Sequence, residues 1–587
     1  MSAGAKEHRQ DRRVAVVFSS LLFVLFWLGR SHSYGPGDSA QHVICGLLWG
    51  VPHPPGYPLQ TALAWAWSRL GWADAGAAIN GLSGLFAAAS AGVLFLLLRR
   101  RSCRLSAALS GAVLMALSPL FWYYSLVAEV RALNGLLALA CALLAADWAR
   151  GASPRSLGVF AFVFGLGLSH HPTFILLSPA YVIWLSARRP PPRQAGSALL
   201  LAFCGLALPY LLLGLRLAHS LPAYDLFEVR GWGDLLPLYL RKGLGGPLRA
   251  VAGAGMLGSG RFDLGRLGLH AGWFLSSLWT HAGIAGLVLA AGGTASLWRR
   301  DRRELSAWAL WAAASAGAFI LLGSQQYAGQ DAYTRAVAVR FHLLPLIAVF
   351  ALAGYGAEAL ARRVRPLFMT VLAASLILAP LTLRRLSMSH SDPLLEYARA
   401  WIRDSEPGDI VVLGSDDTIF AAWDLELVRR ESAGRAFLIP SMFAFPPYIR
   451  SLQARYPGLS LPRDGDGRLT TDWGAWLLLN PGSAVLLEPS LLGAALKDSP
   501  HVTAQGSLLR ARADAARTDP AADARRFLDA PETGSVSLQS VRSWTQEVYL
   551  LESRSLMARW LLSRLDSGKD GAEAERLRAL VGSLSLD

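Results

Sequence analysis

The first 390 residues consist mostly of apolar stretches separated by short polar ones. A helix that crosses a bilayer needs roughly 20 mostly apolar residues, and about eleven stretches fit that description. The sequence therefore predicts a mainly α, polytopic membrane protein. The predicted spans cover residues 14–29, 77–98, 105–123, 130–148, 157–170, 172–187, 196–215, 271–297, 305–323, 341–360 and 366–383.

Clusters of arginine follow every second predicted span. Because cytoplasmic loops carry an excess of Lys and Arg, this alternation predicts a cytoplasmic N-terminus. The clusters are Arg99, Arg100 and Arg101, then Arg150 with Arg155, Arg188 and Arg189 with Arg193, Arg299 and Arg300 with Arg302 and Arg303, and Arg362 and Arg363 with Arg365. Loops 30–76, 216–270 and 324–340 are then expected outside, and an odd number of spans puts the C-terminal region outside too.

From about residue 390 the apolar runs shorten and acidic residues become common. Residues 393–403 and 417–430 have the pattern of helices, whereas 409–413, 436–439, 476–479 and 484–487 resemble buried strands. These elements predict a small α/β domain followed by a charged helical tail, most periodic at 542–565. We expect three parts: a cytoplasmic N-terminus at 1–13, a transmembrane domain at 14–389 that includes the first outer loop at 30–76, and an extracytoplasmic α/β domain with its tail at 390–587.

The composition agrees with a membrane protein, because 53% of the 587 residues are hydrophobic and 17% are charged. The net charge of +15 is held in clusters between apolar runs, which argues against a nucleic-acid partner. All four cysteines lie in or beside apolar segments, so no disulfide framework is expected. The basic start resembles a signal peptide, but no small-x-small cleavage pattern follows, so we expect an uncleaved anchor. Arginine far outnumbers lysine, as in GC-rich bacterial genomes, and we therefore expect a bacterial inner membrane with a periplasmic C-terminal domain.

The first predicted outer loop begins with a turn signal, Tyr34-Gly35-Pro36-Gly37, that Asp38 and Ser39 follow directly. Either residue is a favoured N-cap for the short helix predicted at 40–50. Asp38 is also a candidate general base, since a carboxylate facing a cavity takes a proton from an incoming hydroxyl. The sequence leaves both roles open.

Four prolines surround His53 and Gly56 in residues 52–58, so this backbone is stiff and cannot continue a helix. Stiffness alone is a structural explanation, but a rigid turn also holds an imidazole in position at a site. Histidine can neutralise or hydrogen-bond a phosphate, and its neutral form can bind a metal. Neither an HExxH motif nor paired cysteines accompany it, so we expect no metal and no other cofactor.

A second set of polar residues lies at the predicted outer ends of the spans. Ionisable groups at membrane depth are costly and usually face a partner or a cavity, although each could be an interfacial anchor. Together, cations and an acid on one face suit the attack of a hydroxyl on a carbon that bears a phosphate leaving group. No nucleotide-binding loop is present. The set comprises Glu129, Arg131 and Asn134, then His170 and His171, then Arg335, Arg340 and His342.

Several motifs resemble the signature of a bacterial and eukaryotic polytopic family long labelled as of unknown function. They are Gly37-Asp38-Ser39-Ala40-Gln41, His53-Pro54-Pro55-Gly56-Tyr57-Pro58, Ala128-Glu129-Val130 with Ala132-Leu133-Asn134, Gly167-Leu168-Ser169-His170-His171, and Arg340-Phe341 with Pro345. The family includes a transmembrane protein O-mannosyltransferase and is similar to the GT-C glycosyltransferases. The resemblance extends over about residues 14–430, where Ile410 to Leu413 and the Ser415-Asp416-Asp417-Thr418 run with Trp423 look like the family's strand after the membrane.

The resemblance implies a GT-C-like bundle that transfers a sugar from a polyprenyl-phosphate donor to a protein or glycan hydroxyl, with inversion and with Asp38 as the base. The sequence departs from the family pattern at two positions: Gln41, where the family commonly has Glu, and Arg131, where it often has Tyr. A transporter or flippase is the alternative, although we see no inverted repeat of the kind that transporters show. The expected catalytic residues are Asp38, His53 and Glu129; the expected donor-phosphate ligands are Arg131, His170, His171 and Arg340; and Ser39, Pro54, Pro55, Gly56 and Tyr57 shape the motif.

Overall fold

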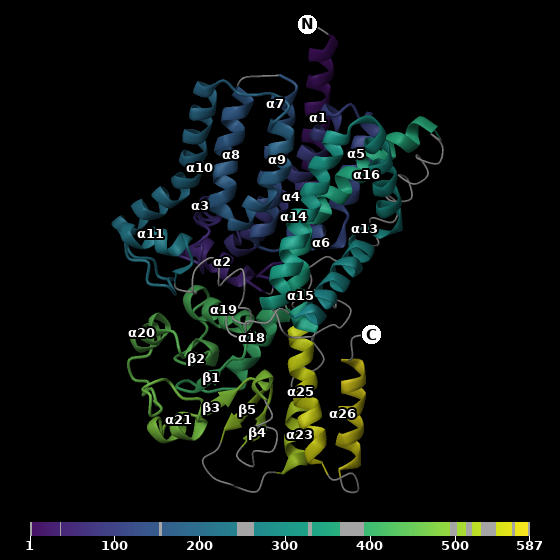
Figure 1. Cartoon of the computed structure of the whole chain (residues 1–587). Coiled ribbons are helices and arrows are strands. Elements are labelled where there is room, and N and C mark those ends of the chain that lie inside the picture. Colours follow the sequence, from purple (N-terminus) through teal and green to yellow (C-terminus); the bar gives the residue numbers. More distant parts are fainter. Residues whose placement is uncertain are drawn as a thin grey trace. The chain divides into compact units, whose positions relative to one another are not determined.

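A computed structural model describes residues 3–35, 37–151, 155–242, 263–326, 332–363, 393–492, 502–511, 519–529, 548–565 and 570–584 (Figure 1). The chain divides into two compact units. The first unit comprises the described residues of Met1–His32, Cys45–Tyr224 and Val229–His390, and the second those of Ser33–Ile44, Asp225–Glu228 and Ser391–Asp587. The predicted outer loop therefore contributes twelve residues, Ser33–Ile44, to the unit that contains the C-terminal domain.

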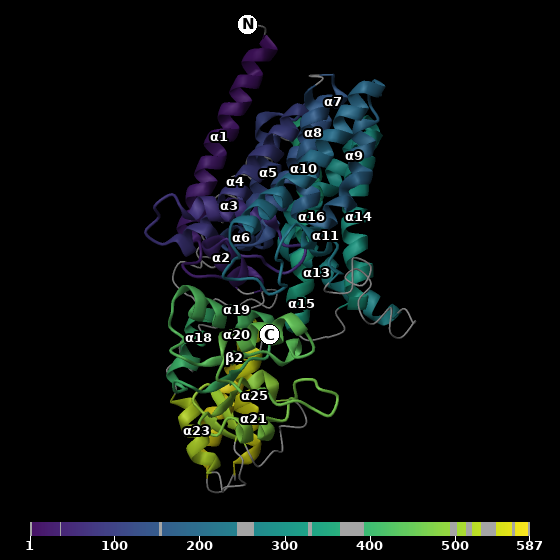
Figure 2. The same cartoon turned by 90° about the vertical axis from the view of Figure 1, so that its left-hand side faces the viewer.

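The first unit is a helical bundle, and the chain is a multi-pass membrane protein. Seven of its described helices are long and apolar enough to cross a membrane, in agreement with seven of the predicted spans. The helix α4 (Ala75–Arg100) packs beside α1 (Ala3–Gly29), and the Ser19 hydroxyl of α1 donates to the Ala88 carbonyl of α4 at 3.0 Å (Figure 2). The seven are α1 (Ala3–Gly29), α4 (Ala75–Arg100), α7 (Val130–Ala149), α10 (Pro192–His219), α13 (Leu264–Arg300), α14 (Arg302–Gln326), and α15 with α16 (Ala332–Val339 and Leu343–Arg363).

A proline bends one of the other predicted spans, and two more are present as helices shorter than these seven. Residues 105–123 were expected as one helix, but α5 (Leu105–Ala116) and α6 (Pro119–Leu126) meet at a 64° bend. Pro119 explains the break, since proline has no N–H to donate and its ring clashes with the preceding turn. The spans expected at 157–170 and 172–187 are shorter helices, α8 (Arg155–His170) and then η1 (Pro172–Leu177) with α9 (Ser178–Leu185). The span expected at 366–383 lies outside the described residues.

Short helices lie in the predicted outer loops. They are α2 (Ser39–Leu48) and α3 (Pro58–Ser68) in the first loop, and α11 (Trp232–Tyr239) in the loop expected at 216–270. That second loop is also shorter than expected, because α13 already begins at Leu264. These short helices supply rigid backbone on which the predicted site residues are carried.

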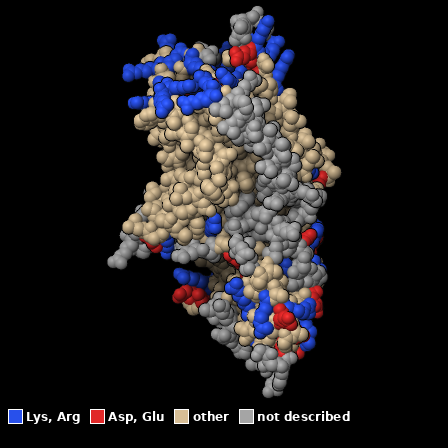
Figure 3. All heavy atoms as spheres, turned by 90° about the vertical axis from the view of Figure 1, so that its right-hand side faces the viewer, with Lys and Arg blue, Asp and Glu red and all other residues tan. Residues whose placement is uncertain are grey.

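The five predicted basic clusters share one end of the bundle. Arg99 pairs with Asp11 of α1 at 2.7 Å, Arg101 with Glu304 of α14 at 3.0 Å, and Arg104 with Glu358 of α16 at 3.8 Å. Arg188 stacks on Trp148 at 4.7 Å, which brings a fourth cluster to the same end. Figure 3 shows the Lys and Arg side chains gathered at this end, above a broad band of uncharged surface. This distribution agrees with the predicted alternation of the helices.

The second unit is built on a five-stranded sheet in the order β2-β1-β3-β5-β4. The strands β1 (Ile410–Val412), β2 (Ala436–Leu438) and β3 (Val485–Leu487) are parallel, and Ile410 is opposite both Ala436 and Val485. Every residue of these three strands is buried, as expected for parallel strands covered on both faces. The helices of the unit are α18 (Pro393–Arg403), α19 (Asp416–Trp423), α20 (Pro446–Arg455), α21 (Trp473–Leu479), α23 (Pro520–Leu528), α25 (Val548–Arg564) and α26 (Gly571–Ser583).

The sequence prediction for this unit was right at its centre and wrong at its edge. The strand predicted at 476–479 is wrong, because these residues belong to α21, which Asp472 starts by accepting from the N–H groups of Gly474 and Ala475. The antiparallel strands β4 (Val502–Gln505) and β5 (Leu508–Ala511) were not expected, and β5 includes the start of the predicted helical tail. A four-residue apolar run does not distinguish strand from helix by periodicity. The predicted helix at 542–565 is α25 from Val548; residues 542–547 lie outside the described part.

One buried carboxyl stands at the carboxyl end of these parallel strands. Glu488 follows β3, and its side chain accepts from the Gly414 N–H at 2.7 Å and from the Thr418 hydroxyl at 3.2 Å. Burial raises the pKa of Glu488, and the hydrogen bond from Gly414 opposes the rise. The carboxyl thereby fixes the loop after β1, which leads into α19.

Candidate functional site

The predicted site residues fall into the two compact units. Asp38 and Ser39 belong to the second unit, whereas His53, Glu129, Arg131, the paired histidines and Arg340 belong to the first. The helix α2 runs from one unit into the other, with Ser39–Ile44 in the second and Cys45–Leu48 in the first. The geometry of each group is therefore described separately.

Asp38 stands directly before α2. Its carbonyl accepts the His42 N–H at 3.0 Å, which is the first bond of the helix, so Asp38 occupies the N-cap position. The Ser39 hydroxyl accepts the Gly35 N–H at 2.9 Å and closes the preceding turn, and Gly37 has a positive φ of 72° within it. Asp38 is half-buried, whereas Ser39 and Gln41 are fully buried. The expected cap position is present, and it is compatible with the expected role as a base.

The His-Pro-Pro-Gly run forms a tight turn in the first unit. The Gly56 N–H donates to the His53 carbonyl at 2.9 Å, and the peptide bond between Pro54 and Pro55 is cis. Gly56 has a φ of 86°, which strains any residue with a side chain, and a Cβ at this position would lie 2.6 Å from the Leu238 side chain of α11. The Tyr210 hydroxyl donates to the Pro55 carbonyl at 2.7 Å. The turn is thus held from two neighbouring helices, as expected for a motif that fixes one imidazole.

Tyr57 joins the first-unit histidines. Its hydroxyl lies 3.3 Å from His53 Nε2, and its ring centre lies 6.4 Å from that of His170 and 6.0 Å from that of His171. Tyr57 is 4% exposed, so these groups meet in a largely dry environment. The structure thereby brings together His53, Tyr57, His170 and His171, which the sequence supplies from positions more than a hundred residues apart.

The start of α7 lies beside this cluster of Tyr57 and the histidines. Glu129 is the N-cap of this helix, where its side chain accepts the Val130 N–H at 3.2 Å. His170 Nε2 lies 2.9 Å from the Val130 carbonyl, and since a carbonyl only accepts, Nε2 carries the proton. Asn80 of α4, which sequence reasoning missed, bridges Ser31 and Ala128 with bonds of 3.0 and 2.8 Å. A buried amide in an apolar helix was the available signal for Asn80.

Two arginines stack on one aromatic ring near this helix start. The guanidinium carbons of Arg131 and Arg340 lie 4.5 and 5.2 Å from the ring centre of Phe341. Arg131 is only 7% exposed, which is too little for an interfacial anchor. No described carboxylate pairs with Arg131, and its Nε has no hydrogen-bond partner within the described part of the chain. Arg131 is therefore a buried cation at the start of α7.

His171 lies near two guanidinium groups and two other imidazoles. The groups that act on it electrostatically are Arg131, His170, Arg241 and His53. Sequence reasoning missed Arg241, which follows α11 with a φ of 54° in a loop that carried no motif. The His171 side chain itself is held by Thr173, whose hydroxyl lies 2.6 Å from Nδ1.

The remaining predicted cations of the first unit belong to α15 and its junction with α16. An Arg335 N–H donates to the Ser276 hydroxyl at 2.9 Å, and His342 Nδ1 lies 2.8 Å from the Ser277 hydroxyl, so both are tied to α13. The described residues contain no group of three His, Cys, Asp or Glu side chains that could hold a metal ion. What the first unit offers is imidazole and guanidinium groups around an aromatic centre, an arrangement suited to an anion.

Comparison with known proteins identifies one segment of the chain. Residues 38–193 match the family model of the protein O-mannosyl-transferase TMEM260 N-terminal domain. The expected family resemblance is confirmed over this segment. The segment contains every predicted site residue except Arg340.

Two curated relatives and one solved structure extend the comparison. The mouse protein O-mannosyl-transferase TMEM260 is 33% identical over 223 residues, which cover 36% of this chain and 32% of the relative. The Dictyostelium discoideum protein of the same name is 22% identical over 178 residues, or 28% of this chain and 22% of the relative. The match thus spans about a third or less of the length of either relative. Apo ArnT from Cupriavidus metallidurans aligns with a TM-score of 0.36 and 13% identity over 86% of this chain and 99% of that one.

Proposed function

We propose that this protein is a membrane glycosyltransferase of GT-C type. It transfers a sugar from a polyprenyl-phosphate donor to a hydroxyl of a protein or glycan, on the extracytoplasmic side and with inversion at the anomeric carbon. The proposed orientation has a cytoplasmic N-terminus and a C-terminal α/β domain outside, which is the periplasm if the source is bacterial. Protein O-mannosyl transfer, the activity for which the mouse and Dictyostelium relatives are named, supports this class of reaction.

The observation that carries the proposal is a buried cation without a counter-ion. Arg131 acts electrostatically on His170 and His171, which lie beside Tyr57, and no described carboxylate neutralises it. A buried, unpaired charge is costly, and the cost is offset if a substrate supplies the opposite charge. The donor phosphate is such a group, and its charge grows as the sugar leaves.

The proposed chemistry divides the work between the two groups of residues. Asp38 takes the proton from the acceptor hydroxyl, whose oxygen then forms a bond to the anomeric carbon. The bond from that carbon to the phosphate oxygen breaks, and its electron pair leaves with the polyprenyl phosphate. Arg131, Arg340 and the histidines stabilise the added negative charge on the phosphate. His53 and Glu129 orient the reactants, and the Pro54-Pro55-Gly56 turn with Tyr57 keeps His53 in place.

The test is transfer of labelled mannose from a polyprenyl-phosphate mannose by the purified protein in liposomes, with the Asp38→Asn variant beside the wild type. The variant keeps the size and the N-cap capacity of the residue but removes the base. We expect transfer to fall by roughly 100-fold or more, since general-base catalysis contributes 10²–10⁴-fold. Full transfer by Asp38→Asn would overturn its assignment as the base.

Asp74→Asn is the matched control. Asp74 lies in the same predicted outer loop and caps α4, where it accepts the Ala77 N–H at 2.9 Å. The substitution is chemically identical, so transfer by this variant is expected to equal that of the wild type. Movement of the intact lipid-linked sugar across the liposome bilayer, without transfer, would instead support a flippase.

A further inference from the structure

The helices α13 and α16 form a hollow near their arginine-rich ends. The two backbones touch where Gly293 meets Leu352 and Gly356 meets Leu289; a Cβ on either glycine would lie within 1.9 Å of the opposing carbonyl oxygen. Beyond this crossing, the small side chains of Ala295, Ser296 and Ala359 leave space between the helices. The cavity there is about 510 Å³.

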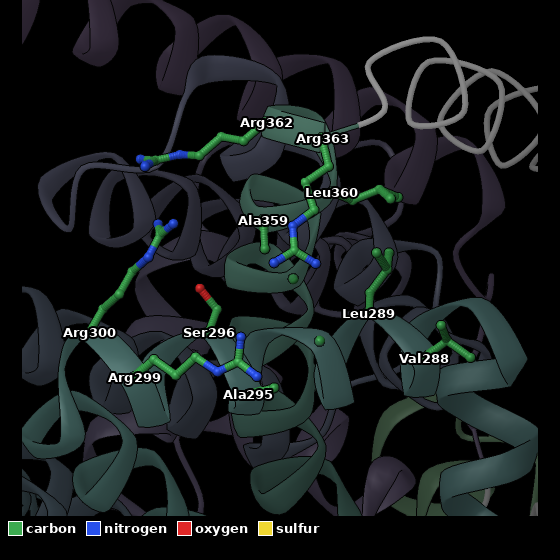
Figure 4. Close-up of a pocket in the computed structure, with 12 residues that line it drawn as sticks. Val288, Leu289, Ala295, Ser296, Arg299, Arg300, Ala359, Leu360, Arg362 and Arg363 are labelled. Carbon is green, nitrogen blue, oxygen red and sulfur yellow. The ribbon is translucent and has the colours of Figure 1, made fainter.

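Apolar walls and arginines line this cavity. Val288, Leu289 and Leu360 form the walls, and four arginines stand at the helix ends: Arg299, Arg300, Arg362 and Arg363. Figure 4 shows Arg363 reaching from α16, and Arg299 from α13, toward the space beside Ser296. Arg362 is bound to Glu358 at 2.6 Å, but Arg299, Arg300 and Arg363 have no partner among the residues that the structure describes.

We propose that this hollow binds the headgroup of an anionic phospholipid. Three guanidinium groups without a partner in the described part of the chain match a phosphate in charge and in hydrogen-bond geometry, and basic pockets between helix ends are where such headgroups bind. The apolar walls of Val288, Leu289 and Leu360 continue the site toward the bilayer interior and accommodate acyl chains. The positive-inside tendency explains arginines at this end, but it does not explain a concave space between them.

Native mass spectrometry of the full-length protein with phosphatidylglycerol or phosphatidylcholine tests this proposal. The wild type is expected to retain phosphatidylglycerol preferentially. Replacing Arg299, Arg300 and Arg363 together by Gln should weaken that preference by roughly tenfold or more, since each basic residue adds to the attraction for an anionic lipid. An unchanged preference in this variant would overturn the proposal.

Two further variants separate the hollow from surface charge. Ala295→Leu fills the cavity and keeps every arginine, so it should lose the bound lipid as well; retention at wild-type level would mean attraction by charge alone and would also overturn the proposal. The control is Arg189→Gln with Arg193→Gln, which removes exposed arginines from the same end of the bundle but outside the cavity. This control is expected to keep the wild-type preference.

A second observation concerns the loop that carries Asp38. Within the second unit, the Gly37 N–H donates to the side chain of Asp417 at the start of α19. Asp417 is 2% exposed, and the two residues are 380 positions apart in the chain. Tyr34, three residues before Gly37, is also buried, at 2% exposed. The C-terminal domain thus holds the backbone next to Asp38.

We infer that Asp417 is a positioning residue for Asp38, an inference that rests on the proposed function. Gly37 directly precedes Asp38 and adopts a positive φ, so the bond from its N–H anchors the turn one peptide before the one that leads into Asp38. Small displacements of a reacting group reduce rates strongly. The α/β domain would then act in the reaction without touching the substrate.

Kinetics of the full chain test this inference. Asp417→Ala should lower kcat for mannose transfer by roughly 10- to 100-fold with little change in KM for the donor, because orientation is lost and binding is kept. Asp417→Asn retains an oxygen that accepts the Gly37 N–H, so it should restore most of the activity.

The control variant is Asp472→Ala, which removes a comparable carboxylate from the start of α21 in the same unit and should leave kcat unchanged. Equal activity of Asp417→Ala and Asp472→Ala would overturn the positioning role. If Asp38→Asn is inactive while Asp417→Ala is fully active, only the positioning inference fails. If Asp38→Asn is active, the proposed base itself fails.

Discussion

The two ends of the helical bundle differ in whether the arginines packed against the helices have carboxylate partners. At the end where α4 and α16 finish, Arg99, Arg101 and Arg104 each pair with a carboxylate of another segment. At the end where α7 begins, Arg131 and Arg241 have no described carboxylate partner. Charges that are paired inside the protein serve its structure, whereas a buried charge left unpaired is available to a ligand.

Glu304 is the carboxylate with the most partners among these pairs at the first end. It is 2% exposed, and besides the ion pair with Arg101 its carboxylate accepts from Trp184 and Trp308 at 2.8 Å each and from Tyr355 at 2.7 Å. These partners come from four different segments of the bundle. Three hydrogen bonds and an ion pair occupy both oxygens of this carboxylate, so it serves the packing of the bundle.

We expect the largest effect, on stability, from a substitution that breaks the network around Glu304. Glu304→Ala leaves Arg101 without its partner and three buried donors without an acceptor, so the free energy of unfolding should fall by about 3–5 kcal/mol. Unfolding in detergent, followed by tryptophan fluorescence, measures the change. Sugar transfer per folded molecule should stay near the wild-type level, and a large loss of transfer without destabilisation would contradict the assignment of this end to structure.

The second effect is on activity rather than on stability. Arg131→Gln should reduce transfer from the lipid-phosphate donor by roughly 100- to 1000-fold, the usual loss when one stabilising donor of a developing charge is removed. Because Arg131 is not engaged in a described ion pair, the unfolding midpoint should stay the same or rise. Transfer rates and thermal unfolding of the same preparation test both statements.

Arg131→Lys sharpens the test, because it retains the charge but not the planar group that stacks on Phe341. We expect intermediate activity for this variant. Wild-type activity of Arg131→Gln would contradict the comparison between the two ends.

The smallest expected effect comes from a partly exposed ion pair at the end of the bundle where α4 and α16 finish. Asp147→Asn removes the partner of Arg150, whose side chain is 33% exposed, and should change the free energy of unfolding by about 0–1 kcal/mol. Transfer should be unaffected. A loss of transfer here would indicate that charge at this end also matters for the reaction.

The sequence predicted most of the membrane region because the signals there are local. Apolar length identifies a span without knowledge of its neighbours, and the arginine clusters order the spans. Prolines also act locally, yet Pro119 was not weighed against the apolar run around it, so a bent pair of helices was expected as one span. In the C-terminal unit the buried parallel strands were found, whereas α21 and the antiparallel pair β4 and β5 were not, since short elements take their form from their partners.

The candidate site also has features that are local in the sequence and features that depend on the fold. The sequence alone identified the candidate residues for the chemistry: Asp38 after a turn, His53 in a proline-rich run, and the histidines and arginines at the ends of spans. Only the tertiary structure decided that Tyr57 stands among the histidines, that Arg131 is buried without a carboxylate from the described residues, and that Asp417 holds the loop of Asp38. Sequence motifs are local features of the chain. The contacts that pair a charge or leave it unpaired depend on positions up to 380 residues apart, so no local pattern predicts them.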